Sequence, residues 1–334
     1  MLKFRYLFDN PDLARMLLKN WDYDENSEEM FQYFRISANA IYPLRIHGEV
    51  CYLRFSPVSE KRERNVMAEL AFLDYLRGLG YPAMEAVKSR GGEEVVRKET
   101  PWGEFYASVF KRVAGEQINQ TDFNDEIMFS YGSTLGELHA FSRQYANPSV
   151  KRWTHRDAFD WMEKTLSELG LDQEPMQELA LLRREFDQLP ITQDNYGLIH
   201  FDFEPDNVFY DETSQRCSVI DFDDTMYHWF VMDIVQALDA IQDEMEIDDC
   251  SHQETVFLKG YRSQFNIDEE VLSMRSVFRR FAGLYQFVRV ARAMQERWEN
   301  EPIWMVELRE KLERLLIKSE RNFGLNFGLE TKSS

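Results

Sequence analysis

Residues 196–235 read YGLIHFDFEPDNVFYDETSQRCSVIDFDDTMYHWFVMDIV, and this segment decides how the whole chain is interpreted. Short apolar runs, YGLIH, NVFY and CSVID, are separated by acidic turns. They predict a small β insertion within a half of the chain that otherwise has helical patterns. Loops held by short strands on a rigid scaffold often carry binding and catalytic residues. We therefore expect the chemistry of this protein to lie here.

Two acidic motifs lie in this segment. His200, Asp202 and Asn207 form the pattern H-x-D-x-x-x-x-N, and Asp221 ends the next strand-like run, SVID. Phosphoryl transfer needs a carboxylate that orients the attacking hydroxyl and accepts its proton. It also needs oxygen ligands for Mg²⁺, which bridges and neutralises the ATP phosphates. The spacing therefore predicts a kinase that uses ATP, with Asp202 as the base and Asn207 and Asp221 as Mg²⁺ ligands.

These motifs, with the aromatic run MYHWF and a helix that begins VMDI, resemble the aminoglycoside phosphotransferase and choline kinase-like family. The resemblance covers roughly residues 25–325 and is sharpest over 196–235. It implies an α+β, bilobal protein-kinase-like fold. The N-terminal lobe would hold a five-stranded antiparallel sheet and one helix, and the C-terminal lobe would be helical.

The resemblance also implies roles for residues outside the catalytic carboxylates. His200 matches a structural histidine beneath the metal-binding strand. Arg54 lies where the family has its phosphate-binding lysine or arginine, and Glu69 lies where the paired glutamate would be. Lys111 and Val113 belong to the expected adenine-binding linker, residues 110–113. Arg54 could instead be a surface residue of an edge strand, and Glu69 could lie on a solvated helix face.

Two positions depart from the expected patterns. The loop of residues 36–41 (ISANAI) contains no glycine, unlike the glycine-rich lid of protein kinases. Family members often have a Ser/Asn turn here, so Ser37 and Asn39 are candidates for phosphate contact, with a plain β turn as the alternative. Asp206 precedes Asn207 where relatives commonly have glycine.

The rest of the chain predicts two lobes. Residues 1–113, the expected nucleotide-binding lobe, hold strand-like runs (FQYFRI, YPLRIHG, EVCYLRF, AMEAVKS, EEVVRKE, GEFYASVFKRV), a hairpin turn at Gly48 and Glu49, and helices over 10–20 and 60–78. The polar stretch 114–122 opens a helical lobe, 114–327, and 328–334 reads as a disordered tail. Helices are expected over 123–146, 155–169, 173–188, 230–246, 251–264, 268–298 and 302–324.

Composition excludes several classes of protein. The 334 residues include 39 basic and 59 acidic side chains, a formal net charge of −20, which does not favour nucleic acids or anionic membranes. No apolar run reaches the roughly 20 residues of a membrane-spanning helix. The three scattered cysteines form neither a disulfide framework nor a CxxC zinc site, and they suit a reducing cytoplasm. The expected partner is a small-molecule hydroxyl acceptor; the sequence does not indicate the oligomeric state.

The acceptor pocket is expected between the catalytic loop and the helices after residue 230, because the γ-phosphate must point at the base. Its expected lining is Glu204, Asp223, Asp224, Tyr227 and Trp229, with Tyr285 and Arg289 as further candidates. Acidic and aromatic side chains attract cations, which leads to the hypothesis of a hydroxyl-bearing small molecule with an amine or other cationic group. Arg289 and Arg292 could instead meet a carboxylate. Asp223 and Asp224 could also serve only metal binding and loop structure.

Three other functions stay open at this point. Asp221, Asp223 and Thr225 fit the DxDxT motif of haloacid dehalogenase-type phosphatases, but that fold needs a parallel sheet of βα units after the motif. A non-catalytic nucleotide-binding module would have lost the base or the metal ligands, all of which are retained. A protein Ser/Thr kinase of the same family would share the machinery and differ only in the acceptor.

Overall fold

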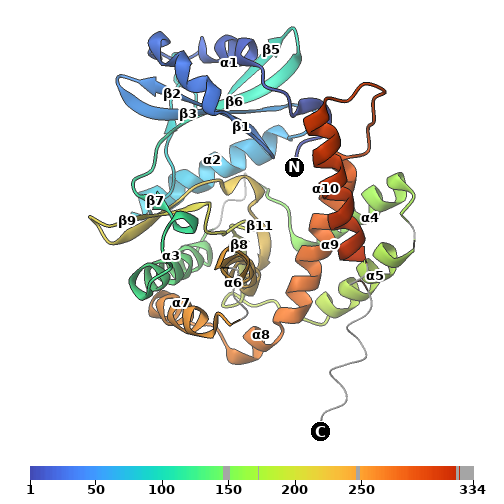
Figure 1. Cartoon of the computed structure of the whole chain (residues 1–334). Helices are drawn as coiled ribbons and strands as arrows, with labels where there is room; N and C mark the ends of the chain where they lie inside the picture. Colours follow the sequence, from blue (N-terminus) through green and yellow to red (C-terminus); the bar gives the residue numbers. More distant parts are fainter. Residues whose placement is uncertain (146–150, 172, 246–248, 321–322, 324–334) are drawn as a thin grey trace.

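The computed structural model describes residues 1–145, 151–171, 173–245, 249–320 and 323, so the predicted tail over 328–334 lies outside the described residues. A small lobe built on a sheet sits above a larger helical lobe (Figure 1). This arrangement is the α+β, two-lobed organisation that the sequence predicted. No helix in the described part of the chain is both long enough and apolar enough to cross a membrane.

The small lobe is built on an antiparallel sheet. Its strands are β1 (Arg35–Ile36), β2 (Ala40–Ile46), β3 (Glu49–Pro57), β4 (Ala86–Val87), β5 (Val96–Thr100) and β6 (Gly103–Lys111). They follow the order β1-β2-β3-β6-β4, and β5 also pairs with β6. The sheet therefore has six strands rather than the five that the resemblance implied. The first half of the expected strand FQYFRI instead belongs to a 3₁₀ helix, η2 (Glu25–Tyr33), and its last two residues form β1.

The turn between β2 and β3 consists of His47 and Gly48, with φ angles of 51° and 82°. Positive φ at both central residues is typical of a type I′ turn, whose twist matches that of the flanking strands. Glu49 already belongs to β3 and pairs with Ile46. The turn therefore lies one residue before the predicted position at Gly48 and Glu49.

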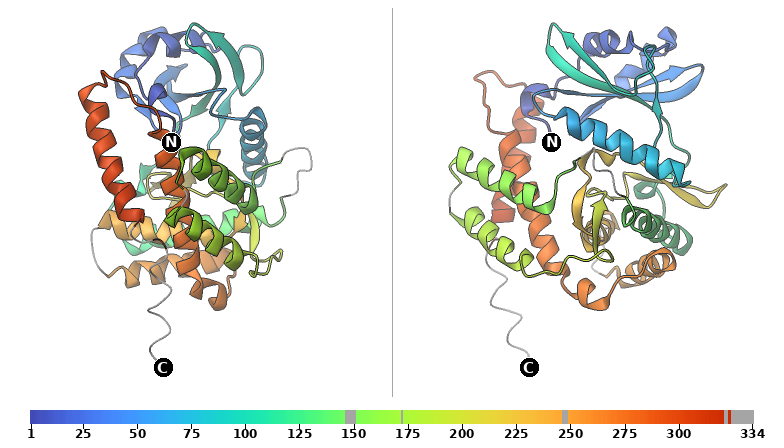
Figure 2. Two further views of the ribbon diagram at one scale, coloured as in Figure 1. Left: turned by 90° about the vertical axis from the view of Figure 1, so that its right-hand side faces the viewer. Right: turned by 180° about the vertical axis from the view of Figure 1, so that it is seen from behind.

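Helices cover both faces of this sheet. On one face, α1 (Pro11–Leu18) buries Leu13 and Leu17 against Tyr42 and Leu53. On the face toward the helical lobe lies α2 (Glu63–Gly78), which begins later than predicted because residues 58–60 form a turn after β3. Its apolar side chains join the core of the large lobe. The helix therefore connects the packing of the two lobes (Figure 2).

The large lobe is built from helices close to the predicted ranges. They are α3 (Asp125–Ser142), α4 (His155–Leu169), α5 (Glu174–Phe186), α6 (Val231–Met245), α7 (Ser251–Gln264), α8 (Glu269–Ser273), α9 (Arg275–Ala293) and α10 (Ile303–Glu320). The single helix predicted over 268–298 is divided at Met274, which ends α8 and precedes α9. Close packing of α3 on α7 requires Gly132, because a Cβ there would lie 1.9 Å from the carbonyl oxygen of Phe257.

The predicted β insertion consists of two hairpin-like pairs. Its strands are β8 (Tyr196–Ile199), β9 (Val208–Asp211), β10 (Arg216–Val219) and β11 (Met226–Trp229). β8 pairs with β11, and β9 pairs with β10 and with β7 (Glu116–Gln117), all antiparallel. No βα units of a parallel sheet follow Asp221 in the described residues, which removes the fold basis of the phosphatase interpretation.

The N-terminal segment crosses from the small lobe to the large one. The backbone N–H of Leu2 donates to the carbonyl oxygen of Ser37, 2.8 Å away, next to β1. The 3₁₀ helix η1 (Phe4–Tyr6) buries Phe4 against Val290 of α9 and Met305 of α10. This cluster lies beside the small lobe, where α10 rises along the flank of the molecule (Figure 1).

Candidate active site

The loop between β8 and β9 holds Asp202 and is fixed from below by a buried carboxylate. The Oδ2 atom of Asp233 accepts the backbone N–H of His200 at 2.8 Å, and Oδ1 accepts that of Phe201 at 2.7 Å. Phe201 has a φ of 65°, a conformation that costs energy for a bulky residue. The two backbone hydrogen bonds that Asp233 accepts hold this strained turn and thereby set the direction of Asp202.

Asp233 is itself oriented by a buried histidine. The Nε2 atom of His139 lies 3.1 Å from Oδ2 of Asp233, and its Nδ1 lies 2.8 Å from the hydroxyl of Tyr261. Burial lowers the pKa of His139, although Asp233 opposes this shift. The neutral ring therefore carries its proton on Nε2 and donates to Asp233, while Nδ1 accepts from Tyr261. The sequence marked Asp233 only as part of the run VMDI and assigned it no role.

His200 connects this loop to the strand that leads to Asp221. Its Nε2 donates to the carbonyl oxygen of Ile220 at 2.9 Å, and its ring packs on Phe222 with the ring centroids 4.6 Å apart. Burial lowers the pKa of His200, so the ring is neutral. These contacts are those of a structural residue, and they tie the loop of Asp202 to Asp221.

Asp202 and Asn207 lie within hydrogen-bonding distance at the two ends of the catalytic loop. The Nδ2 atom of Asn207 donates to Oδ2 of Asp202 at 2.9 Å and to its backbone oxygen at 3.0 Å. The amide oxygen of Asn207 is thereby left available for a cation. Burial, with the neighbouring charges of Glu204, Asp224 and Asp221, raises the pKa of Asp202 well above its usual value.

Asp221 offers oxygen atoms that suit a hard divalent cation. Its Oδ1 is buried without a hydrogen bond and lies 3.5 Å from Nη1 of Arg54. Burial raises the pKa of Asp221 even though Arg54 opposes the shift. No group of three or more His, Cys, Asp or Glu side chains in the described residues could hold a metal by itself. Amide and carboxylate oxygens from Asn207 and Asp221 fit Mg²⁺ if nucleotide phosphates supply further ligands.

Arg54 and Glu69 form a buried ion pair between β3 and α2. The two guanidinium nitrogens donate to the two carboxylate oxygens at 2.8 and 2.6 Å. The side chains are 9% and 1% exposed, and the guanidinium also lies over the ring of Phe110. Arg54 is thus neither a surface residue nor on a free edge, and Glu69 is not on a solvated face. The structure brings both residues toward Asp221.

A cavity of about 600 Å³ opens between the sheet and β9, with Arg54 and Asp221 in its lining. Further lining residues are Ile41, Pro43, Tyr52, Phe110, Lys111, Val113, Phe209 and Ile220. The N–H of Lys111 donates to the carbonyl oxygen of Glu85, and that of Arg112 to Val50. The backbone N–H of Lys111 is therefore not available to an adenine base. Within the expected linker, the backbone N–H of Val113 is the candidate donor.

Ser37 and Asn39 point in different directions. Asn39 is buried, and its Nδ2 donates to Oδ2 of Asp223 at 3.1 Å. Ser37 is exposed and uses its backbone N–H on the carbonyl oxygen of Asn39. The side chain of Asn39 therefore connects this loop to the acidic turn after β10, residues 221–224. Ser37 shapes the loop through its backbone.

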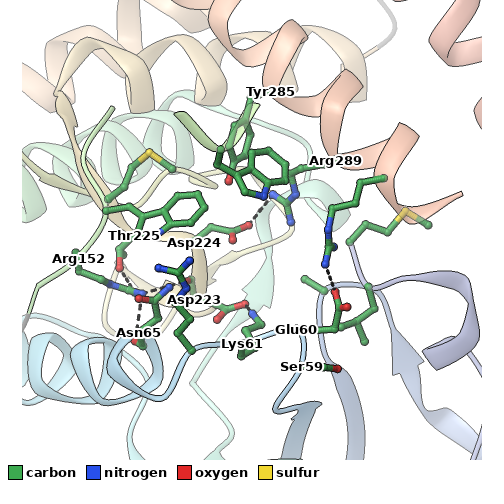
Figure 3. A pocket seen from close by; sticks show the side chains of 18 of the residues that line it. Ser59, Glu60, Lys61, Asn65, Arg152, Asp223, Asp224, Thr225, Tyr285 and Arg289 are labelled. Carbon is green, nitrogen blue, oxygen red and sulfur yellow. Dashed lines mark hydrogen bonds and ion pairs between the residues drawn. The ribbon is translucent and has the colours of Figure 1, made fainter. Parts of the chain in front are cut away.

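A second cavity, of about 270 Å³, lies on the other side of this acidic turn (Figure 3). Its lining includes Asp223, Asp224, Tyr285 and Arg289, four of the residues expected around the acceptor. Its other polar and aromatic lining residues are Ser59, Glu60, Lys61, Arg62, Asn65, Arg152, Trp153, Trp161, Thr225 and Arg292.

Ion pairs from α9 cross this second cavity. Arg289 pairs with Asp224 at 2.7 Å, and Arg292 pairs with Glu60 of the small lobe at 2.9 Å. Burial opposes ionisation of Asp224, but Arg289 and Lys61 outweigh it and hold the pKa of Asp224 below its usual value. The cavity thus presents charges of both signs, and those of Asp224 and Glu60 are balanced by Arg289 and Arg292.

A family model described as the phosphotransferase enzyme family matches residues 37–270. The chain belongs to this family. Amicoumacin kinase of Bacillus subtilis (strain 168) is 26% identical over 213 residues, which cover 62% of this chain and 62% of that protein. The match thus spans less than two thirds of this curated relative.

Solved structures share the fold of this member of the phosphotransferase enzyme family. An amicoumacin kinase in complex with AMP-PNP, Ca²⁺ and Ami has a TM-score of 0.76 at 21% identity, covering 95% of both chains. A microcompartment-associated aminopropanol kinase has a TM-score of 0.69 at 20% identity, covering 93% of this chain and 95% of its own. An aminoglycoside-3′-phosphotransferase of type VIII has a TM-score of 0.54 at 15% identity, covering 77% and 100%. The predicted family and its bilobal fold are confirmed.

Three residues expected in the acceptor pocket of this family member lie elsewhere. The described lining of the second cavity does not include Glu204, Tyr227 or Trp229. Trp229 is buried in the core, where its Nε1 donates to the carbonyl oxygen of Pro190 at 3.0 Å. Tyr227 pairs with Leu198 across β11 and β8. Glu204 lies in the catalytic loop, where burial raises its pKa to about 7.

The second cavity also contains residues that were not expected around the acceptor. Among them, Glu60 and Lys61 come from the turn before α2, Trp153 precedes α4, and Trp161 lies in the middle of α4. Trp161 packs against Tyr285 with ring centroids 5.4 Å apart. No motif marks these residues, because only the packing of the small lobe and α4 against α9 brings them together.

Proposed function

We propose that this chain is an ATP-dependent phosphotransferase that moves the γ-phosphate to a hydroxyl of a small molecule bearing an amine or other cationic group. One observation carries the proposal. The acidic turn after β10 contributes Asp221 to the cavity that holds Arg54, and Asp223 and Asp224 to the second cavity. Nucleotide and acceptor would therefore meet at this turn, close to Asp202.

The first cavity suits ATP. Apolar side chains from β2, β3, β6 and β9 would enclose the base, and Arg54 at the inner end would meet phosphates. After pairing with Glu69, the guanidinium of Arg54 keeps further N–H groups, which could donate to phosphate oxygens. A structure similar in fold was solved with AMP-PNP and Ca²⁺, which supports a nucleotide and a divalent cation here.

Asn207 and Asp221 would hold Mg²⁺. The metal, when bound, would neutralise the phosphate oxygens as ADP leaves. Asp202 would accept the hydrogen bond of the acceptor hydroxyl and orient its oxygen toward the γ-phosphorus. As the new oxygen–phosphorus bond forms, the bond from the γ-phosphorus to the β–γ bridging oxygen breaks. The hydroxyl proton passes to Asp202 and then to solvent, so the products are ADP, the phosphate ester and a proton.

The second cavity would take the acceptor. Asp224 and Glu60 could each receive an amine, while Arg289 and Arg292 could receive acidic or carbonyl groups of the same molecule. Amicoumacin, aminopropanol and aminoglycosides appear in the names of the relatives, which supports a small acceptor. A cavity of about 270 Å³ walled by Trp153 and Trp161 favours such a molecule over an extended protein segment.

The cytoplasm is part of the same proposal. ATP is available there, and Cys51 and Cys217 are free thiols, as a reducing compartment would keep them.

A coupled ADP-release assay tests the function. Purified protein with Mg²⁺ is screened against amino alcohols, aminoglycosides, hydroxy amino acids, uncharged sugars and nucleosides, with a generic protein substrate included. We expect ADP release with amine-bearing hydroxyl compounds, and none from the Asp202→Ala variant. Turnover of protein alone would favour a protein kinase. The absence of ADP release across the panel, together with the absence of ATP binding, would contradict the assignment.

A further inference from the structure

Each carboxylate of the acidic turn after β10 is paired with a cation from a different element. The pairs are Arg54 of β3 with Asp221, Lys61 of the turn before α2 with Asp223, and Arg289 of α9 with Asp224. Two of these cations have a place in the proposed function, one toward the nucleotide and one toward the acceptor. Lys61, between them, has none so far.

Lys61 and Asp223 form a largely buried ion pair, with side chains 15% and 10% exposed. Among the described residues, Asp223 is the ion-pair partner of Lys61, and Asp223 also accepts the hydrogen bond of Asn39. Burial lowers the pKa of Lys61 to about 8, while the charge of Asp224 opposes the shift. Such burial is costly for an ammonium group, and a purely structural tie could be made by two neutral side chains.

The position of Lys61 lies on the route of the phosphoryl group. Arg54 and Asp221 line the nucleotide cavity, whereas Lys61 lines the acceptor cavity together with Asp224. In Figure 3, Lys61 lies beside Asp223 at the floor of the second cavity, on the side of the small lobe. A phosphate that extends from Arg54 toward the second cavity would therefore approach the acidic turn at which Lys61 pairs with Asp223.

We propose that Lys61 binds the γ-phosphate of ATP and that Asp223 holds it ready. The inference rests on the proposed function. A lysine ammonium has three donors on a flexible stem, so it can keep Asp223 and still donate to phosphate oxygens. It neither gains nor loses a proton. Its charge is present where negative charge lies during transfer, and a fixed charge in a buried site stabilises transition states effectively.

Nucleotide affinity tests this proposal without any acceptor. The dissociation constants of ATP and ADP are measured by calorimetry with Mg²⁺ for the wild type, Lys61→Met, Lys61→Arg and Lys164→Met. Methionine keeps the length of the stem and removes the charge. Lys164 is an exposed lysine of α4, 75% accessible, and serves as the matched control.

We expect Lys61→Met to weaken ATP binding by about 10- to 100-fold, as for a lost hydrogen bond to a charged group. ADP binding should change less than about twofold, because ADP lacks the γ-phosphate. Lys61→Arg should keep part of the preference for ATP, and Lys164→Met should keep all of it.

The alternative is that Lys61 only ties the small lobe to the acidic turn. In that case Lys61→Met and Asp223→Asn would lower the melting temperature equally and weaken ATP and ADP alike, and the proposal would be overturned. If Lys61→Met does not fold, the decision rests on Lys61→Arg and Asp223→Asn, since an unchanged ATP-to-ADP ratio in both would also overturn it. A wild type that binds neither nucleotide would instead contradict the proposed function.

Discussion

Arg54 and Glu69 are joined by two hydrogen bonds of 2.8 and 2.6 Å. This buried ion pair links β3, the central strand of the small lobe, to helix α2. Because the side chain of Arg54 is only 9% exposed, removing Glu69 leaves a guanidinium with little access to water. Its fork also determines how Arg54 faces Asp221, so the pair bears on both stability and nucleotide binding.

Glu69→Ala should therefore lower the free energy of unfolding by about 3–5 kcal/mol, the usual cost of breaking a buried ion pair from one side. Urea denaturation followed by circular dichroism measures it. Glu63→Ala, on the exposed first turn of the same helix, is the control and should cost far less. Equal losses in the two variants would mean that the pair adds nothing beyond helix propensity.

Asp202 and Asp221 should behave differently when each is replaced by alanine. Asp202→Ala should lower turnover by about 10²- to 10⁴-fold while ATP binding is nearly unchanged, because only proton acceptance and orientation are lost. Asp221→Ala should impair both turnover and Mg²⁺-dependent ATP binding. Thermal melts with ATP, with and without Mg²⁺, separate the two effects. Loss of ATP binding in both variants would contradict this division of roles.

Asp233 should act on the reaction through the catalytic loop. An amide in Asp233→Asn can accept only one of the two backbone N–H groups of His200 and Phe201, so the strained turn loses a support. We expect lower kcat with a nearly unchanged KM for ATP, and a lower melting temperature. Steady-state kinetics with a turned-over acceptor measure the first two. An unchanged kcat would show that the loop keeps its shape without this carboxylate.

Asp224 should contribute to recognition of a cationic acceptor. Asp224→Asn keeps the size of the side chain but removes the charge opposite Arg289. KM for an amine-bearing acceptor should rise while the dissociation constant of ATP is unchanged. An unchanged acceptor KM, or turnover of uncharged or anionic hydroxyl compounds alone, would end the idea of a cationic acceptor and leave the kinase assignment intact.

Acid should destabilise the fold through His155. Burial lowers the pKa of His155 from 6.5 to about 4. Between these values the unfolded chain binds a proton that the folded chain does not, so the free energy of unfolding falls as the pH falls from about 6.5 toward 4. His155→Asn can still donate to the hydroxyl of Tyr196 and should reduce this dependence in thermal melts, while the part due to other buried histidines remains. His252→Asn, at an exposed histidine, should leave the dependence unchanged.

The predicted features are those that depend on neighbours along the chain. The spacing of Asp202, Asn207 and Asp221 is set by one hairpin, and the ends of α4 and α7 follow from local apolar periodicity. Trp229 was placed in the wrong environment because its direction on β11 depends on which face packs against α5 and α9. Alternation along a strand cannot say which face meets a cavity.

Lys61 is a second residue whose environment could not be predicted from neighbours along the chain. Nothing in the run SEKRER distinguishes it from the neighbouring charged residues. Its burial arises only when the turn before α2 meets the acidic turn of another lobe, a contact between residues far apart in the chain. Arg54 and Glu69 could be found because a family resemblance supplies long-range pairing that a single sequence lacks.

The N-terminal segment changes how the two lobes can move. Two lobes joined only by a linker can open by rotating about that linker. Here Phe4 is buried against α9 and α10, and Arg292 pairs with Glu60, on the side of the cleft opposite the linker. A small lobe held at both edges resists opening about the linker but can still rotate slightly on the large lobe. Nucleotide exchange would then depend on small rotations of the small lobe rather than on a wide separation of the two lobes.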